Sequence, residues 1–505
     1  MSFENLSIKE ESKRFKDHLL VDGNERIIFS GIFGIGKTYF IDNFFEQENE
    51  SFISIKLNPV NYSVSPNQDI FELIKFDIGY QLFSKNPEFE KIEFEKVFSS
   101  NFYLIENYKK VISLLIKNLS KLDHRVDAIA KSTVELGEEI NRFKDKIEKD
   151  EEKELKNFLD YFKNQIGTFR EENSITELIN NLVETLKINN PKKKIVLVID
   201  DLDRIDPEHI FRIMNVFSAH FDFYDFKNEN KFGFDHVVLI SDITNIRGIF
   251  HNKYGTNIDF SGYIDKFYSN EIFYYDFVSV INNNIDKFLS SIEIDNNRVY
   301  THLQSSSNYY KDELIFLLRH MVAANSISMR ALINFLKSKV ILDSYAIKSY
   351  MSADYFYSDS TPILIVFQIL EKIVGGQENF VNILNKTLER YPSLEITPRT
   401  SYWRDRIGNL VMLIDQNQNR LNVTKEEKNL YINKEFDIKV QYIIHPSDNF
   451  EGLIGKAERI GYPNDDFSNK DISFHETISK RKIPYFQLLI NAYLSLKEIP
   501  KENAY

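Results

Sequence analysis

The stretch Arg26-Ile-Ile-Phe-Ser-Gly-Ile-Phe-Gly-Ile-Gly-Lys-Thr38 decides the fold. Its first five residues form a short apolar run that predicts a buried strand. The next eight match the pattern G-x-x-x-x-G-K-[ST], and an apolar-periodic segment that predicts a helix follows them. Strand, glycine-rich loop and helix in this order are the context in which the pattern binds phosphate. We therefore predict a phosphate-binding loop at residues 31–38; the alternative is a glycine-rich turn before a basic helix.

The residue types in this loop suit an anionic ligand. Glycines let the backbone curl until successive N–H groups face one anion, and the helix that follows points its positive end at the same place. Lys37 adds a cation for the β- and γ-phosphates, and the Thr38 hydroxyl can ligate Mg²⁺. The predicted nucleotide-binding residues are Gly31, Gly34, Ile35, Gly36, Lys37, Thr38 and Tyr39.

A second strand carries the acids that such a loop needs. Residues 195–199 are five consecutive branched apolar residues, typical of a strand buried on both faces of a parallel sheet. Asp200 follows at the end where α/β sheets bind ligands, and we predict that it holds Mg²⁺. Asp201 can polarise the attacking water as a catalytic base. The alternative for both aspartates is an ordinary turn after a strand.

Composition excludes several other classes. The 505 residues carry a formal net charge of −12, with 43% hydrophobic and 27% charged residues, which is typical of a globular chain. The absence of cysteine excludes disulfides and every cysteine-based metal site. No secretory signal and no membrane span is evident, so we expect a cytoplasmic protein without a membrane partner. The acidic balance argues against broad nucleic-acid binding, although a local basic patch stays open.

The aspartate-rich segment also carries a family resemblance. Residues 200–204, Asp-Asp-Leu-Asp-Arg, resemble the D-D-L-D-R signature of KAP-family P-loop NTPases, a branch of the STAND group within the AAA+-like ATPases. Three further segments are similar to that family: a strand with a polar sensor end, a Y-L-x-K-I-F-Q segment and a segment of the helical lid, at 237–242, 263–273 and 327–335. The lid match is partial, because Met329 replaces the usual proline.

The resemblance implies an ATPase that uses ATP and Mg²⁺. Asp201 stands where many related ATPases have Glu, which suggests slow hydrolysis. Lys37, Asp201, Arg204 and Arg330 are the predicted catalytic residues. Arg330 either reaches the γ-phosphate from the lid or is a surface arginine. Arg204 either contacts phosphate across a subunit interface or pairs with Asp203 or Asp206.

A heptad repeat interrupts the predicted core. Apolar residues alternate at spacings of three and four from Ile105 to Ile147, which indicates a long helix with one apolar seam. The seam packs either on a second helix or the body of the same chain, or on a neighbouring subunit or partner protein. A capping signal at Ser174 marks the return to the core, and we expect the helix from there to about Leu186 to cross over into the acidic strand.

These patterns predict an α/β fold: a P-loop NTPase core with a parallel sheet, a long helical insertion, a helical lid and a mostly α C-terminal domain. The expected boundaries are 1–100 and 174–270 for the two parts of the core, 101–173 for the insertion, 271–345 for the lid and 346–505 for the C-terminal domain. In that last domain we expect an apolar helix from Pro362 to Gly375 and a strand at 438–444. Arg399, Trp403, Arg404 and Arg406 form a basic–aromatic cluster there that could stack on single-stranded nucleic acid.

Three functions stay open on the sequence. The first is an oligomerising, ATP-dependent switch that controls an effector protein from a neighbouring gene, which the family resemblance associates with bacterial anti-phage defence. The second is an ATP-driven motor on nucleic acid, which would need a basic track. The third is a nucleotide-bound scaffold that does not hydrolyse.

Overall fold

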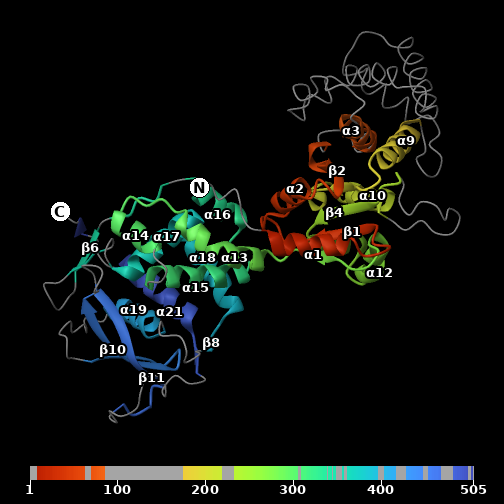
Figure 1. The fold of residues 1–505 in the computed structure, drawn as a ribbon. Coiled ribbons are helices and arrows are strands. Elements are labelled where there is room, and N and C mark those ends of the chain that lie inside the picture. Colours follow the sequence, from red (N-terminus) through yellow and green to blue (C-terminus); the bar gives the residue numbers. More distant parts are fainter. Residues whose placement is uncertain are drawn as a thin grey trace, which may run out of the picture. The chain divides into compact units, whose positions relative to one another are not determined.

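The computed structural model describes residues 8–62, 70–85, 174–218, 232–304, 309–337, 339–343, 345–348, 355–357, 361–395, 403–416, 428–446, 453–467, 481–498 and 502–503. The chain divides into two compact units (Figure 1). The sheet unit comprises Ile8–Phe33 and Lys37–Asp276, and the C-terminal unit comprises Phe277–Tyr505 together with Gly34–Gly36. The predicted helical insertion, with its heptad repeat at residues 105–147, lies outside the described residues.

A parallel five-stranded sheet forms the centre of the sheet unit, and this confirms the predicted α/β class. The strand order is β2-β3-β4-β1-β5. The bounds are β1 Arg26–Ser30, β2 Phe52–Leu57, β3 Lys194–Ile199, β4 His236–Ser241 and β5 Phe273–Tyr274. All residues of β1 and β4 are buried, as are the five predicted apolar residues of β3. Strands covered on both faces read as continuous apolar runs, which is why these three could be found from sequence.

Helices cover both faces of this sheet. Their bounds are α1 Lys9–Leu19, α2 Lys37–Gln47, α3 Ile70–Lys85, α9 Ser174–Asn189, α10 Pro207–Phe217, α11 Ile243–Tyr254 and α12 Phe260–Ile264, with short 3₁₀ turns η1 Pro59–Tyr62, η2 Leu202–Arg204 and η3 Asp265–Phe267. On one face, Phe15 of α1 meets Phe29 of β1 and Phe44 of α2 edge-on, at centroid distances of 5.2 and 4.8 Å. Edge-to-face rings are favourable beyond the area they bury, so α1 and α2 are held on the sheet by aromatic packing.

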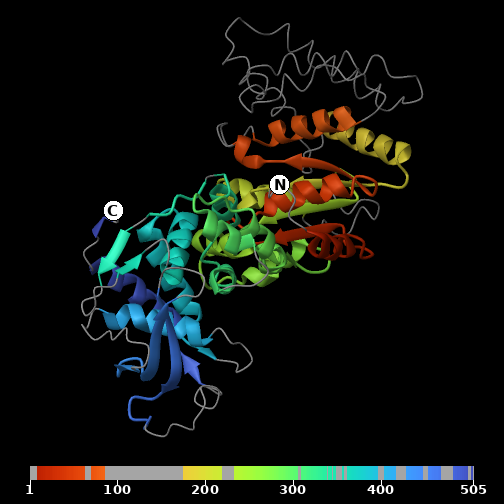
Figure 2. The same cartoon turned by 60° about the vertical axis from the view of Figure 1, so that its left-hand side comes forward.

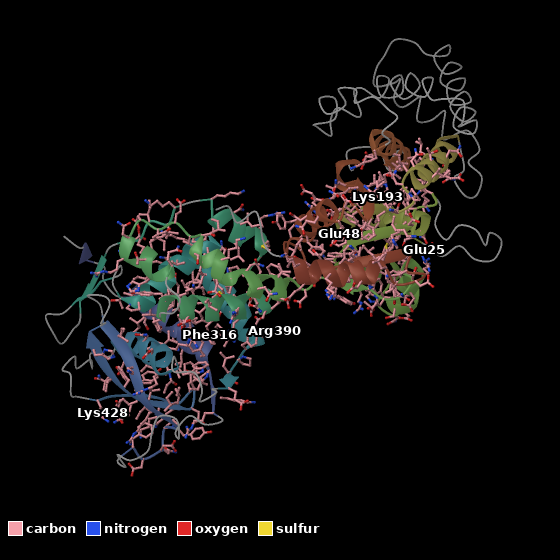
Figure 3. The ribbon with its side chains drawn as sticks, viewed as in Figure 1. Glu25, Glu48, Lys193, Phe316, Arg390 and Lys428 are labelled. Carbon is pink, nitrogen blue, oxygen red and sulfur yellow. The ribbon has the colours of Figure 1, made fainter. Side chains whose placement is uncertain are left out.

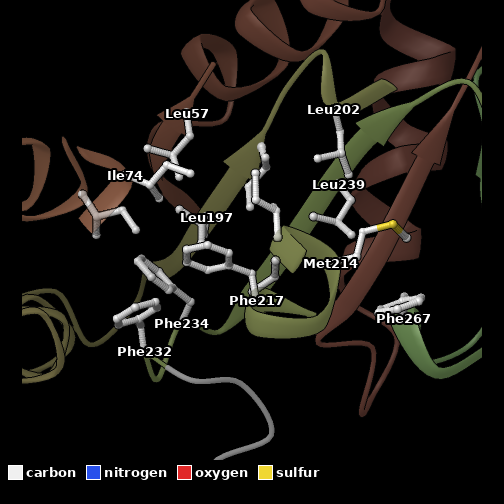
Figure 4. Close-up of a cluster of buried hydrophobic side chains, with 14 of the residues drawn as sticks. Leu57, Ile74, Leu197, Leu202, Met214, Phe217, Phe232, Phe234, Leu239 and Phe267 are labelled. Atoms are coloured by element: carbon white, nitrogen blue, oxygen red, sulfur yellow. The ribbon is translucent and has the colours of Figure 1, made fainter. Parts of the chain in front are cut away.

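The opposite face carries the larger apolar core. Leu57, Leu197 and Leu239 of three neighbouring strands point into it, and Ile74 of α3 and Phe217 of α10 cover them (Figure 4). Helices α3 and α9 lie side by side along this side of the sheet (Figure 2). The predicted crossover helix is α9, and it leads directly into β3. These layers leave the ends of the strands as the place where polar groups collect.

The C-terminal unit begins with helices and continues as a mixed α and β region. Its helices are α13 Phe277–Ser290, α14 Asn297–Gln304, α15 Tyr309–Ala323, α16 Met329–Phe335, α17 Pro362–Val374, α18 Gln377–Arg390, α19 Trp403–Gln416 and α21 Tyr485–Glu498. The apolar helix expected from Pro362 is α17, and it ends where Gly375 adopts a φ of +83°. That left-handed conformation is the usual helix stop, because glycine adopts it without steric cost.

Three small antiparallel groupings complete this unit. The strand expected at 438–444 is β10, Ile438–Pro446, the centre of a sheet with β9 Asn429–Asn433 and β11 Leu453–Gly461. The others pair β8 Leu394–Glu395 with β12 Lys482–Ile483, and β6 Tyr345–Lys348 with β7 Tyr355–Tyr357 and β13 Glu502–Asn503. Helix α19 crosses β11 at Gly408 and Gly455, where a Cβ on Gly408 would lie 2.4 Å from the Gly455 carbonyl oxygen. Only glycine permits backbones to approach so closely.

Candidate functional site

The predicted phosphate-binding loop has the backbone that such a site requires. Strand β1 ends at Ser30, and α2 begins at Lys37. Between them Gly34 and Gly36 have φ values of +82° and +86°, a region that residues with a side chain rarely adopt. The first N–H groups of a helix have no acceptor inside the helix, and they carry its positive end. The loop and the first turn of α2, with an exposed Thr38 and a half-buried Tyr39, therefore suit an anion.

Lys37 lies folded onto its own loop. Its Nζ donates to the carbonyl oxygens of Gly31 at 2.6 Å and Ile32 at 3.2 Å. Burial lowers its pKa, against the opposing effect of four neighbouring carboxylates: Asp203, Asp242, Asp200 and Asp201. The ammonium therefore lies among the acids at the carboxyl end of the sheet, which brings the two predicted halves of the site together.

Asp200 is fully buried directly after β3. Its Oδ1 accepts the N–H of Asp201 at 2.8 Å. Its Oδ2 accepts no hydrogen bond, and its nearest charged neighbour is Lys56 Nζ at 3.2 Å. A buried carboxylate oxygen without a hydrogen bond is costly unless a cation compensates it. This oxygen fits a metal-binding role, and carboxylate oxygen is the ligand that Mg²⁺ prefers.

Asp201 adopts an unusual backbone and a specific partner. Its φ is +51°, in the left-handed region that aspartate adopts more readily than most residues with a side chain. Its Oδ2 accepts from Arg204 Nη1 at 2.8 Å, and both side chains are partly exposed. Of the two roles that stayed open for Arg204, pairing with Asp203 or Asp206 differs from the contact seen here, and contact with phosphate stays a prediction. The turn of η2 brings Arg204 back over Asp201 instead.

Asp203 joins the ends of two neighbouring strands. Its Oδ2 accepts the N–H of Asp242 and the Nδ2 of Asn245, both at 3.2 Å. Asp242, the predicted sensor position, caps α11 by accepting the N–H of Thr244 at 2.9 Å. Ser30 Oγ accepts the N–H of Ile243 at 3.1 Å. These bonds fix the ends of β1, β3 and β4 relative to one another.

Lys56 and Asp42 are site residues that the sequence analysis missed. Lys56 Nζ lies 2.6 Å from Asp42 Oδ1 of α2, in addition to its contact with Asp200. The available signal was a single lysine inside the apolar strand Phe-Ile-Ser-Ile-Lys-Leu at 52–57. A charge near the end of a buried strand is uncommon unless it has a partner.

Two of the four members of the basic–aromatic cluster are buried in the C-terminal unit, which argues against its suggested role in nucleic-acid stacking. Trp403 is 5% and Arg406 is 6% exposed. Arg406 pairs with Glu313 at 2.6 Å, and Arg404 donates to the Ala457 carbonyl oxygen at 3.0 Å. Arg399 lies outside the described residues. Side chains used in packing cannot stack on a nucleic-acid strand.

Arg330 occupies the start of α16 with an exposed side chain. It belongs to the C-terminal unit. Its assignment to the γ-phosphate stays a prediction.

The comparisons agree with the motifs. The model of the KAP family P-loop domain matches residues 24–353, which include the loop, the acidic strand and the predicted lid segment. No curated protein matches the chain.

Within the described ranges, no helix is long and apolar enough to cross a membrane. In the same ranges, no group of three or more His, Asp or Glu side chains is arranged to hold a metal ion by itself.

Proposed function

Because the chain belongs to the KAP family of P-loop NTPases, whose domain binds nucleotide, we propose that this protein binds ATP with Mg²⁺ and hydrolyses the ATP slowly. One observation carries the proposal. The loop lysine and a fully buried aspartate with an unbonded oxygen come together at the carboxyl end of a parallel sheet. That is the place where α/β folds bind their ligands.

The proposed chemistry assigns each group one task. Backbone N–H groups of the loop and the first turn of α2 bind the phosphates, and Lys37 moves from the Gly31 carbonyl oxygen to them. Asp200 and the Thr38 hydroxyl hold Mg²⁺, which supplies neutralising charge at the phosphoryl oxygens. Asp201 orients a water and accepts its proton as the water oxygen bonds to the γ-phosphorus. The bond from that phosphorus to the β–γ bridging oxygen breaks, leaving ADP and inorganic phosphate.

The Asp201–Arg204 pair supports slow turnover. A carboxylate oxygen that already accepts from a guanidinium at 2.8 Å has to leave that contact before it can accept from the attacking water. The same contact favours a second candidate function, a nucleotide-bound scaffold that does not hydrolyse. In that case Asp201 would hold Arg204 and would take no part in catalysis, and its left-handed backbone would only allow the chain to turn into η2.

The biological role that we propose is a switch. Nucleotide binding would promote self-association and control of an effector protein encoded by a neighbouring gene, in bacterial anti-phage defence. The heptad repeat of residues 105–147 is compatible with self-association, because a neighbouring subunit is one of the two kinds of partner open to its apolar seam. The net charge of −12 weighs against the motor alternative, and the buried Arg406 and Trp403 offer no stacking surface to nucleic acid.

The test combines binding and turnover. We expect Lys37→Ala to weaken binding of a fluorescent ATP analogue about 100-fold, or roughly 2.7 kcal/mol, because it removes the cation of the loop. Asp201→Asn should keep binding and lower turnover about 100-fold. Lys192→Ala is the matched control, since this exposed lysine precedes β3 at the other end of the sheet.

Each candidate function has its own outcome. Unchanged binding in Lys37→Ala would overturn the site. Binding without any turnover would favour the scaffold. Strong stimulation of turnover by DNA or RNA would favour the motor. Mass measurement with and without ATP tests self-association, and purification together with the product of a neighbouring gene tests the effector.

A further inference from the structure

Lys56 combines three features that the proposed chemistry does not use. It is the one charged residue in β2, the edge strand of the sheet, and it precedes the last residue of that strand. Its ammonium lies between two carboxylates, 2.6 Å from Asp42 Oδ1 and 3.2 Å from Asp200 Oδ2. A lysine carries one charge, so these two acids compete for it.

The backbone of Lys56 is held from both sides. On the outer edge, Gln81 of α3 accepts the N–H of Lys56 at 3.0 Å and donates to its carbonyl oxygen at 2.7 Å. On the inner edge, β2 pairs in parallel with β3, and the N–H of Asp200 donates to the Leu57 carbonyl oxygen at 2.9 Å. The hydrogen bonds of the sheet and of Gln81 therefore fix the backbone positions of Lys56 and Asp200.

The two acids lie in different surroundings. The Asp200 side chain is 1% exposed, whereas that of Asp42 is 54% exposed. A charge interacts more strongly with a buried partner than with one in water. Lys56 therefore compensates the unbonded oxygen of Asp200, the same oxygen that fits a metal, and exposed Asp42 offers the ammonium a second position.

We propose that Lys56 is a positioning residue that competes with Mg²⁺ for Asp200, and that Asp42 sets the strength of this competition. The inference rests on the proposed function, since it needs a metal that arrives with nucleotide. When Mg²⁺ approaches Asp200, repulsion between the cations drives Lys56 toward Asp42. The Lys56 side chain thus keeps a buried carboxylate compensated without metal and makes metal binding weaker and more reversible.

This competition predicts opposite signs for two substitutions. Lys56→Met removes the competing charge and keeps an unbranched stem, so we expect Mn²⁺ to bind about threefold to tenfold more tightly in the presence of ADP. Asp42→Asn removes the second position and leaves Lys56 on Asp200, so Mn²⁺ should bind about threefold more weakly. The double variant should match Lys56→Met, because Asp42 acts only through Lys56.

The measurement is Mn²⁺ binding by electron paramagnetic resonance on the full chain with saturating ADP. Melting temperatures with ADP in Mg²⁺ and with ADP in EDTA provide a second readout. The matched control is Lys194→Met, an exposed strand lysine that lies 3.7 Å from Asp235 at the opposite end of β3. Lys56→Arg keeps the charge and should bind Mn²⁺ close to the wild-type affinity.

The outcomes separate this inference from the function beneath it. Wild-type protein that binds no ADP overturns the proposed function, and the inference with it. If the wild type binds ADP but Lys56→Met binds Mn²⁺ with unchanged or lower affinity, the inference alone is overturned. If Lys56→Met does not fold, the Asp42→Asn arm decides, and unchanged Mn²⁺ affinity there overturns the inference.

Discussion

Two buried acids, one in each unit, have opposite surroundings. Glu313 of α15 is 1% exposed, and both of its oxygens are engaged: Arg406 Nε donates to Oε2 at 2.6 Å, and the Tyr485 hydroxyl donates to Oε1. Asp200 of the sheet unit is equally buried, but its Oδ2 accepts no hydrogen bond. A fully satisfied network is typical of structure, whereas the Asp200 oxygen has only the Lys56 ammonium beside it, at 3.2 Å, and can exchange that contact for a ligand.

The network around Glu313 also shows how the C-terminal unit is held together. Arg406 of α19 donates to the Asp312 carbonyl oxygen at 3.1 Å and lies 3.9 Å from the ring centroid of Phe316, which is labelled in Figure 3. Burial alone would lower the pKa of Arg406, but the charge of Glu313 raises it overall. Burial raises the pKa of Tyr485, and Glu313 adds to the effect. The ion pair therefore joins α15, in the predicted lid, to α19, and the Tyr485 hydrogen bond joins α15 to α21.

The largest expected effect breaks the satisfied network. Arg406→Met should destabilise the C-terminal unit by about 3–5 kcal/mol, because it leaves Glu313 buried without its cation. Chemical denaturation with a probe in this unit measures the loss. The control is Arg390→Met at the exposed end of α18, which should change stability by less than about 0.5 kcal/mol. Equal stability in the two variants would show that Glu313 has other compensation.

The next effect sharpens the contrast at Asp200. Asp200→Asn should lower nucleotide hydrolysis about 100-fold or more, because it removes a proposed metal ligand. It should change the free energy of unfolding without metal by less than about 1 kcal/mol, because Lys56 loses one partner but keeps its contact with exposed Asp42. Turnover and denaturation are measured on the same preparation. A large loss of stability would make Asp200 structural, like Glu313.

A smaller effect tests the pair between Asp201 and Arg204. We expect Arg204→Gln to raise turnover about twofold to fivefold, because it frees the proposed base. Stability should change by less than about 1 kcal/mol, since the pair is partly exposed. Steady-state phosphate release measures the rate. A tenfold fall instead would support the alternative in which Arg204 contacts phosphate.

The smallest effect concerns pH and the C-terminal unit. Burial lowers the pKa of His320, and Arg406 also lowers it, against a bond to the Phe316 carbonyl oxygen. A histidine with a lowered pKa in the folded state does not affect the free energy of unfolding above its unfolded pKa of about 6.5. Below that pH the unfolded chain takes up the proton more readily, so the folded state becomes less stable. His320→Gln should therefore reduce the acid destabilisation between pH 7 and pH 5. Identical slopes for the variant and the wild type would contradict this.

The two units also differ in how much of their structure could be predicted from the sequence. In the sheet unit, apolar runs bounded by glycine or aspartate located β1, β3 and β4, and a capping signal located α9. These patterns are local, so the chain displays them before it folds. In the C-terminal unit the predicted strand at 438–444 is correct, but the same local reasoning grouped Trp403 and Arg406 as a surface. Their burial depends on α15 and α21, which lie far away in sequence.

The sequence alone determined the nucleotide-binding loop, the acidic strand and the membership in a P-loop family, because each depends on residue types at fixed short spacings. Tertiary structure decided the partners. It placed Arg204 on Asp201, Asp203 across two strand ends, Lys56 between Asp42 and Asp200, and Arg406 on Glu313. Two charges pair only when the fold brings them within a few ångströms, and strand pairing and helix packing set that distance. A pattern along the chain can therefore name the chemistry of a site, but only the fold decides which of its charges are already paired.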